Sequence, residues 1–248
     1  MYTDFASVYD RLMADVPYRE WAAYYAELLE QGGVAGGSVA ECACGTGSLT
    51  VELARRYPKI TGIDQSGEML ARAMEKARSR GLLLPFIRQD MRRLSLPRKA
   101  DAILCTCDGV NYLTGAADVM AFFRAARANL KPGGLLVFDV STPYKLEREL
   151  GSCVRALTDE DVAYIWQSGF DAEKSLLDIR MDIFSRTPSG DYHRIAEEQT
   201  QRAHSRPELT EWLTACGFEE IRFFGDRTMT EPQEKEIRWH VRAKTVRS

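Results

Sequence analysis

The sequence has 248 residues, 45% hydrophobic and 28% charged, so it can bury a full core as one large domain or one domain with an insertion. A net charge of -3 excludes the strong overall basic field typical of proteins that hold nucleic acids. We expect a cytoplasmic protein without a membrane anchor, because residues 1–18 do not resemble a signal peptide, no stretch has membrane-spanning length and the six cysteines fit reduced thiols.

Strand-like and helix-like segments alternate through the first 145 residues. An amphipathic helix precedes the first strand and stops at Gly32 and Gly33. Buried strands are predicted over residues 39–44, 59–64, 84–90, 101–107 and 135–140, with helices between most of them, one capped by Ser66 and closed by Gly81. This alternation predicts an α/β fold with a mostly parallel sheet and helices on both faces.

The pattern changes after about Lys145, where apolar and charged residues begin to alternate. Residues 177–183 and 192–204 read as strands joined by the turn TPSGD, which predicts an antiparallel β insertion over residues 146–204 that acts as a lid. The core resumes with a capping box at Ser205 and Glu208. Two further strands, over residues 218–224 and 237–243, bring the core sheet to seven, so the core comprises residues 1–145 and 205–248.

The stretch VAECACGTG, residues 39–47, ends the first strand. Gly45 and Gly47 allow backbone N–H groups to approach an anionic ligand at a helix N-terminus, although such a turn is also a common way to leave a strand. Asp64 ends the next strand, where a carboxylate suits ribose hydroxyls. Thr50 occupies the third glycine position of the NAD fingerprint, which disfavours NAD. The Cys-x-Cys pairs at Cys42 and Cys105 lack zinc-ligand spacing, so we predict no metal.

Four segments in this order, ECACGTG, GIDQSGEML, QDM and LKPGGLLVFDV, resemble the class I S-adenosylmethionine-dependent methyltransferases, over roughly residues 2–143 and 205–244. The resemblance implies a Rossmann-like seven-stranded sheet and S-adenosylmethionine as cofactor, with S-adenosylhomocysteine as product. It implies that Glu41 orders the glycine loop or holds the methionine amine, Asp64 binds the ribose and Asp90 accepts from the adenine amino group. The other implied cofactor contacts are Ala43, Gly45, Gly47, Gln65, Met69, Met91 and Cys107. Many members have glycine at the position of Ala43, and alanine fits there if its φ is negative.

The N-terminal segments FASVYD and DVPYREW resemble the branch of this family that includes small-molecule N-methyltransferases. The resemblance implies that a tyrosine of the first helix, here Tyr9, closes over the methionine end of the cofactor, and that Trp21 lies nearby. Both residues also fit as core aromatics at helical spacing.

Methyl transfer is an in-line displacement that needs positioning and water exclusion, and a base only if the acceptor arrives protonated. The catalytic candidates are Asp108, Asn111 and Tyr112 in CDGVNY and His204 in the insertion. We expect transfer to a small-molecule amine or hydroxyl. Two alternatives remain open, an RNA (tRNA) methyltransferase that uses the basic strand of Arg238, Arg242 and Lys244, and a non-catalytic cofactor-binding module. No feature of the sequence indicates an oligomeric state.

Overall fold

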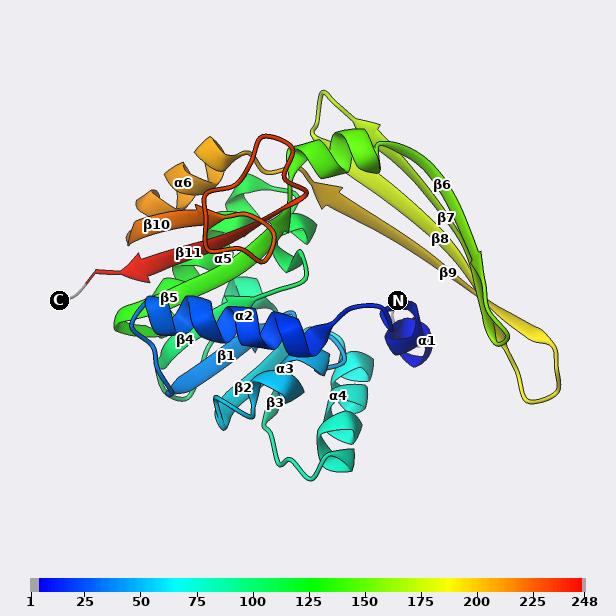
Figure 1. Ribbon diagram of the computed structural model, residues 1–248, viewed down its shortest axis with the longest axis horizontal. Coiled ribbons are helices and arrows are strands. Elements are labelled where there is room, and N and C mark those ends of the chain that lie inside the picture. Colours follow the sequence, from blue (N-terminus) through cyan, green and yellow to red (C-terminus); the bar gives the residue numbers. More distant parts are fainter. Residues whose placement is uncertain (1–4, 247–248) are drawn as a thin grey trace.

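The computed structural model describes residues 5–246 and contains two β-sheets (Figure 1). The larger sheet has seven strands in the order β10-β11-β5-β4-β1-β2-β3, and β1 to β5 run parallel to one another. The predicted Rossmann-like sheet is therefore confirmed. The strands of this sheet are β1 Ser38–Cys42, β2 Lys59–Asp64, β3 Phe86–Arg88, β4 Ala100–Cys105, β5 Leu130–Ser141, β10 Phe218–Phe224 and β11 Arg238–Thr245.

Helices cover both faces of this sheet because each carries an apolar stripe at helical spacing. One core cluster joins the sheet to α5 and α6, and a second joins it to α2 and α3. The predicted caps are confirmed, since Oγ of Ser66 accepts from the Met69 N–H over 3.2 Å and Ser205 forms a capping box with Glu208. The helices are α1 Phe5–Leu12, α2 Tyr18–Gln31, α3 Ser48–Leu53, α4 Gly67–Ser79, α5 Ala116–Asn129 and α6 Arg206–Ala215, with shorter helical turns η1 Met91–Arg93, η2 Gly109–Tyr112 and η3 Lys145–Glu149.

The strand order places a ligand site above the carboxyl ends of β1 and β4. The chain passes from β1 to β2 on one side of β1, whereas β4 lies on its other side. The crossovers from these two neighbouring strands therefore diverge, which opens a crevice at their carboxyl ends. The two last strands run antiparallel, β11 beside β5 and β10 beside β11.

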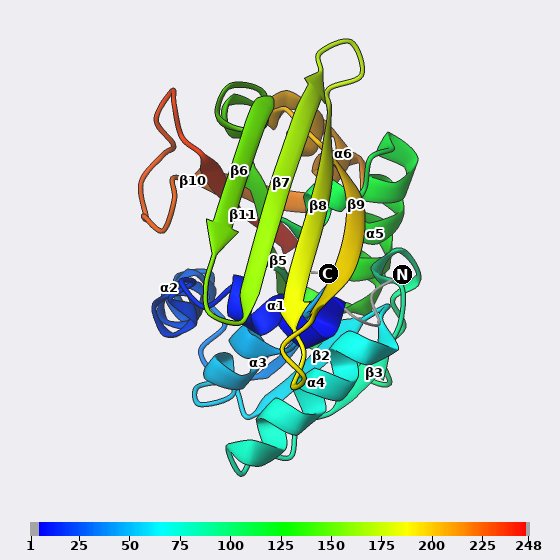
Figure 2. The same cartoon turned by 90° about the vertical axis from the view of Figure 1, so that its right-hand side faces the viewer.

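The second sheet is entirely antiparallel, and its strands lie side by side in the order β6-β7-β8-β9 (Figure 2). It projects beyond the carboxyl ends of the core strands (Figure 1). Its strands are β6 Ser152–Thr158, β7 Val162–Asp171, β8 Leu176–Arg186 and β9 Tyr192–Arg202. On β8 the apolar residues 177, 179, 181 and 183 are buried, whereas Asp178 and Arg180 between them are exposed. Phe5 and Val8 of α1 belong to the same core cluster as the buried residues of β8, so α1 lies between the second sheet and the core.

No helix within residues 5–246 combines the length and the apolar character needed to cross a membrane.

Candidate active site

A cavity of about 410 Å³ lies at the carboxyl edge of the core sheet. Its walls come from α1, from the ends of β1, β2, β3 and β4, and from β9 of the second sheet. The core and the second sheet therefore enclose one shared space. The lining residues are Phe5, Tyr9, Ala43, Gly45, Asp64, Gln65, Ser66, Met69, Gln89, Asp90, Met91, Arg92, Cys107, Gly109, Tyr112, Leu113, Asp118, Glu198, Gln199 and Thr200.

The loop after β1 has a left-handed backbone at three positions. φ is 54° at Gly45 and 69° at Gly47, a region that glycine enters without a steric penalty. A Cβ on Gly47 would also lie 2.8 Å from the Cβ of Ala73, so this position has no room for a side chain. Gly47 is the N-cap of α3 and does not line the cavity.

Ala43 shares this left-handed conformation, with φ of 54°, so the condition under which alanine fits this position without strain, a negative φ, is not met. The turn that leaves β1 requires the positive value, and alanine adopts it at a cost of about 1 kcal/mol.

Asp64 ties the end of β2 to this loop. Its Oδ2 accepts from the Gly45 N–H over 2.8 Å and its Oδ1 accepts from the Ser66 N–H over 2.9 Å. Burial raises the pKa of the Asp64 carboxyl, and the two backbone N–H groups oppose that shift. A carboxylate at this end of the cavity is thus held in place from both sides.

Asp90, at the end of β3, is half of a charged pair that sequence reasoning missed. The guanidinium of Arg92 donates to both of its carboxylate oxygens, at 2.6 Å for the shortest contact, and also to Asp118 over 3.0 Å. These hydrogen bonds from Arg92 lower the pKa of Asp90. Arg92 and Asp118 both line the cavity. The sequence signal that could have predicted the ion pair is the two-residue spacing of Asp90 and Arg92 within one turn.

Comparisons with known proteins decide the family. A family described as a methyltransferase domain matches residues 39–134. YqeM of Bacillus subtilis (strain 168), provisionally described as a methyltransferase, is 36% identical over 246 residues, which are 98% of this chain and 96% of that protein. The chain belongs to the S-adenosylmethionine-dependent methyltransferases. A solved S-adenosylmethionine-dependent methyltransferase from Clostridium acetobutylicum ATCC 824 is 30% identical, covers 99% of both chains and superimposes with a TM-score of 0.88.

A third relative of this methyltransferase is similar over part of its length. It is the dTDP-3-amino-3,6-dideoxy-alpha-D-glucopyranose N,N-dimethyltransferase of Streptomyces fradiae, 30% identical over 122 residues, which are 49% of this chain and 46% of that protein.

Glu41 of the methyltransferase lies beneath the cavity and not in its wall. One carboxylate oxygen accepts from Oγ1 of Thr50 over 2.5 Å and the other from Oγ1 of Thr106 over 3.1 Å. Burial raises the pKa of this carboxyl to about 7. These contacts join β1 to α3 and to the end of β4. They fit the predicted role of Glu41 in ordering the glycine loop.

The two aromatic residues predicted to face the cofactor have different positions. Tyr9 lines the cavity, and burial raises the pKa of its hydroxyl. Trp21 lies outside the cavity walls, because its ring packs against Tyr25 and against Arg238, whose Cζ is 5.1 Å from the ring centroid. The interpretation of Trp21 as a core aromatic is the one that the structure favours.

Of the four catalytic candidates, only Tyr112 lines the cavity. Asn111 is fully buried, and its Nδ2 donates to the carbonyl oxygens of Ser141 over 3.0 Å and Arg202 over 2.9 Å. The carboxylate of Asp108 accepts from Nε2 of Gln201 over 2.8 Å. Asp108 and Asn111 therefore join the core to the second sheet.

His204 is buried and is not part of the cavity wall. Its ring nitrogens lie 3.0 Å from Nη1 of Arg202 and 3.2 Å from the Val110 carbonyl oxygen, and burial lowers its pKa to about 4. The ring is therefore neutral near pH 7 and shielded from an acceptor.

The cysteine pairs at the ends of β1 and β4 are free thiols. Burial raises the pKa of Cys42, Cys44, Cys105 and Cys107, which makes them poor nucleophiles. Only Cys107 lines the cavity.

Proposed function

We propose that this methyltransferase transfers the methyl group of S-adenosylmethionine to a small-molecule amine or hydroxyl that is held between the core and the second sheet. The observation that carries the proposal is the shared cavity. Asp64 and Asp90 lie on its core side, and residues 198–200 of β9 form the opposite wall. Such an enclosed space with converging polar groups suits a small ligand.

The residues at the carboxyl ends of β1, β2 and β3 fit the parts of S-adenosylmethionine. The carboxylate of Asp64 suits ribose hydroxyls, the left-handed loop at Gly45 leaves room for the methionine portion, and the carboxylate of Asp90 suits the adenine amino group. When bound, the cofactor supplies a methyl group on a positively charged sulfur. Nine of the twelve predicted contacts line the cavity and form our proposed cofactor site: Tyr9, Ala43, Gly45, Asp64, Gln65, Met69, Asp90, Met91 and Cys107.

We assign residues 146–204 as the unit that covers the acceptor and residues 1–145 with 205–248 as the core that holds the cofactor. Gln199 of β9 lines the cavity from the cover, and Phe5 and Tyr9 line it from α1, the core helix that packs against the cover. These residues exclude water and orient the acceptor, which are the two contributions that methyl transfer needs from the protein. The activity of the Streptomyces fradiae relative, N,N-dimethylation of a dTDP-linked amino sugar, supports an amine as the acceptor.

The alternative of an RNA substrate was based on an exposed basic strand, and the structure gives that strand little exposed positive charge. The side chains of Arg238 and Lys244 are only 12% and 13% exposed, and Arg242 is buried. Arg238 pairs with Asp139, and Nη1 of Arg242 donates to the Leu28 carbonyl oxygen over 3.0 Å. The cationic side chains of β11 therefore interact with groups of the protein itself, which does not favour their use in binding RNA phosphates.

A transfer assay with methyl-labelled S-adenosylmethionine tests the proposal. Separate arms contain amines, alcohols and phenols of metabolite size, and unmodified tRNA. We expect saturable transfer in at least one small-molecule arm. Transfer to tRNA alone would establish the RNA alternative, and tight binding of S-adenosylhomocysteine with no transfer in any arm would favour a non-catalytic module.

A further inference from the structure

Two consecutive residues at the end of β4 have left-handed backbones although neither is glycine. φ is 54° at Cys107 and 53° at Asp108. This region is unfavourable for residues with a Cβ, so the surrounding contacts must hold the turn in shape. Cys107 and Gly109 both line the cavity. The shape of the strained turn therefore sets one wall of the proposed methyl-transfer site.

The core holds this turn through a buried carboxylate. Oδ2 of Asp139 accepts from the Asp108 N–H over 2.9 Å, and the Tyr25 hydroxyl donates to Oδ1 of Asp139 over 2.7 Å. Arg238 pairs with Asp139 and lies 3.5 Å from the Asp108 carboxylate. These contacts fix the backbone of the turn and balance the charge around it.

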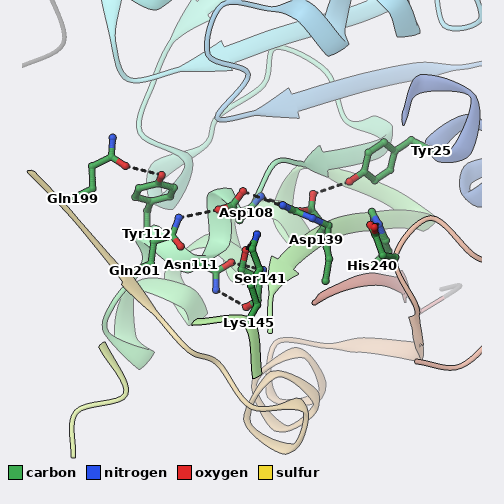
Figure 3. Close-up of polar contacts among 12 residues, drawn as sticks. Tyr25, Asp108, Asn111, Tyr112, Asp139, Ser141, Lys145, Gln199, Gln201 and His240 are labelled. Carbon is green, nitrogen blue, oxygen red and sulfur yellow. Dashed lines mark hydrogen bonds and ion pairs between the residues drawn. The ribbon is translucent and has the colours of Figure 1, made fainter. Parts of the chain in front are cut away.

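The second sheet holds the same turn from the opposite side. Gln201 of β9 is 4% exposed, and its Nε2 donates to Oδ2 of Asp108 over 2.8 Å (Figure 3). Asn111, three residues after Asp108, donates to the carbonyl oxygen of Arg202, the residue after Gln201. The end of β9 is thus attached to the strained turn and to the η2 segment that follows it.

We propose that Gln201 is a positioning residue for methyl transfer. By holding the Asp108 side chain, Gln201 keeps the turn at Cys107 and Asp108 in its left-handed conformation. The wall of the cavity that this turn forms therefore has its correct shape only when the second sheet is docked on the core. This inference rests on the proposed function for its catalytic consequence. The structural consequence, a turn that loosens without Gln201, does not depend on the acceptor.

Three variants test the role of this side chain. Gln201→Met keeps the length of the side chain and removes the donor. The pair Gln201→Glu with Asp108→Asn exchanges donor and acceptor across the same contact and should restore it. Gln167→Met is the matched control, because Gln167 lies on β7 of the same sheet, two strands away from β9, is exposed and does not line the cavity.

Two readouts separate positioning from general structural damage. The first is amide hydrogen exchange of residues 107–112 with S-adenosylhomocysteine bound, and the second is kcat against acceptor KM. Loss of a hydrogen bond to a charged group predicts exchange at least about tenfold faster and kcat at least about tenfold lower in Gln201→Met, with cofactor affinity within about threefold. The exchanged pair should return both values to within about threefold of wild type, and the control should match wild type.

The proposal is overturned by wild-type exchange in a folded Gln201→Met variant, by an equal loss in Gln167→Met, or by failure of the exchanged pair to restore a loosened turn. A rise in acceptor KM with unchanged kcat and exchange also overturns it, since Gln201 would then contact the acceptor. If no acceptor supports turnover in the wild type, the proposed function fails, whereas the exchange measurement still decides the positioning role.

Discussion

The Tyr112 hydroxyl donates to Oε1 of Gln199 over 3.0 Å and so joins the core to the second sheet at the edge of the cavity. Both residues line the cavity, and Tyr112 is 42% exposed. The contact therefore lies at the exposed edge of the cavity, where our proposed acceptor would enter, in contrast to the buried contact of Gln201 with Asp108.

Tyr112→Phe removes this hydroxyl and keeps the ring. Because the contact is at the entrance, we expect a rise in acceptor KM of about three- to tenfold, with cofactor affinity nearly unchanged and unfolding free energy within about 0.5 kcal/mol of wild type. Steady-state kinetics and calorimetry with S-adenosylhomocysteine measure these quantities. A fall in kcat at constant KM would instead place the hydroxyl in the chemical step.

Ala43→Gly should relieve the left-handed strain at the end of β1. Glycine adopts a φ of 54° freely, so we expect stability to rise by up to about 1 kcal/mol in urea denaturation. Ala40→Gly is the control, because Ala40 is buried in β1 and the change removes a packed methyl group, at a cost of about 1 kcal/mol or more. Equal destabilisation by both changes would show that the strain at Ala43 is negligible.

Asp64→Ala should weaken binding of S-adenosylmethionine by about 2–3 kcal/mol, or roughly 30- to 150-fold in Kd, because it removes the carboxylate proposed to bind the ribose. Circular dichroism checks that the loop anchored on Asp64 has not unfolded the core. Glu68→Ala is the control, since Glu68 is an exposed acid in the first turn of α4 and outside the cavity wall. Unchanged affinity in folded Asp64→Ala would remove this residue from the site.

Glu41→Gln should change how stability depends on pH. The folded protein keeps the Glu41 proton up to about pH 7, whereas the unfolded chain releases it near pH 4.5, so between these values the folded state holds more protons. Glu41 therefore makes folding less favourable as pH rises through this window, by about 3 kcal/mol in total.

His204 acts in the opposite direction, because its pKa is lowered to about 4, and its contribution to stability rises between about pH 4 and pH 6.5. Because wild type and Glu41→Gln both contain His204, its contribution cancels when their free energies of unfolding are subtracted. Denaturation at a series of pH values should show that difference growing by about 3 kcal/mol from about pH 4.5 to about pH 7.5 in favour of the variant. A difference that does not vary with pH would mean that Glu41 titrates normally.

Local patterns were sufficient to predict the core sheet. Buried strands such as residues 59–64 are short apolar runs bounded by turns, and the helix that Ser66 caps shows both its start and its apolar stripe in the sequence. The order of the glycine loop, Asp64 and Asp90 along the chain indicated the cavity that we propose as the cofactor site, because each lies at the carboxyl end of a parallel strand.

Other features depend on information that the sequence does not contain locally. Trp21 has the helical spacing of a core residue and of a site residue alike, so only packing distinguishes the two positions. The contact of Gln201 with Asp108 spans 93 positions and requires the second sheet to dock on the core. The backbone conformation of Ala43 is set by the turn, and the residue type gives no sign of it.

Asn111 also holds together the two points at which the chain passes between the sheets. It donates to the carbonyl oxygen of Ser141, where the chain leaves β5, and to that of Arg202, where the chain returns from β9. A segment whose two ends meet can be lengthened, shortened or replaced at a small cost in chain entropy. The residues between these crossings, 142–201, can thus change in length without altering the path of the core chain on either side of them.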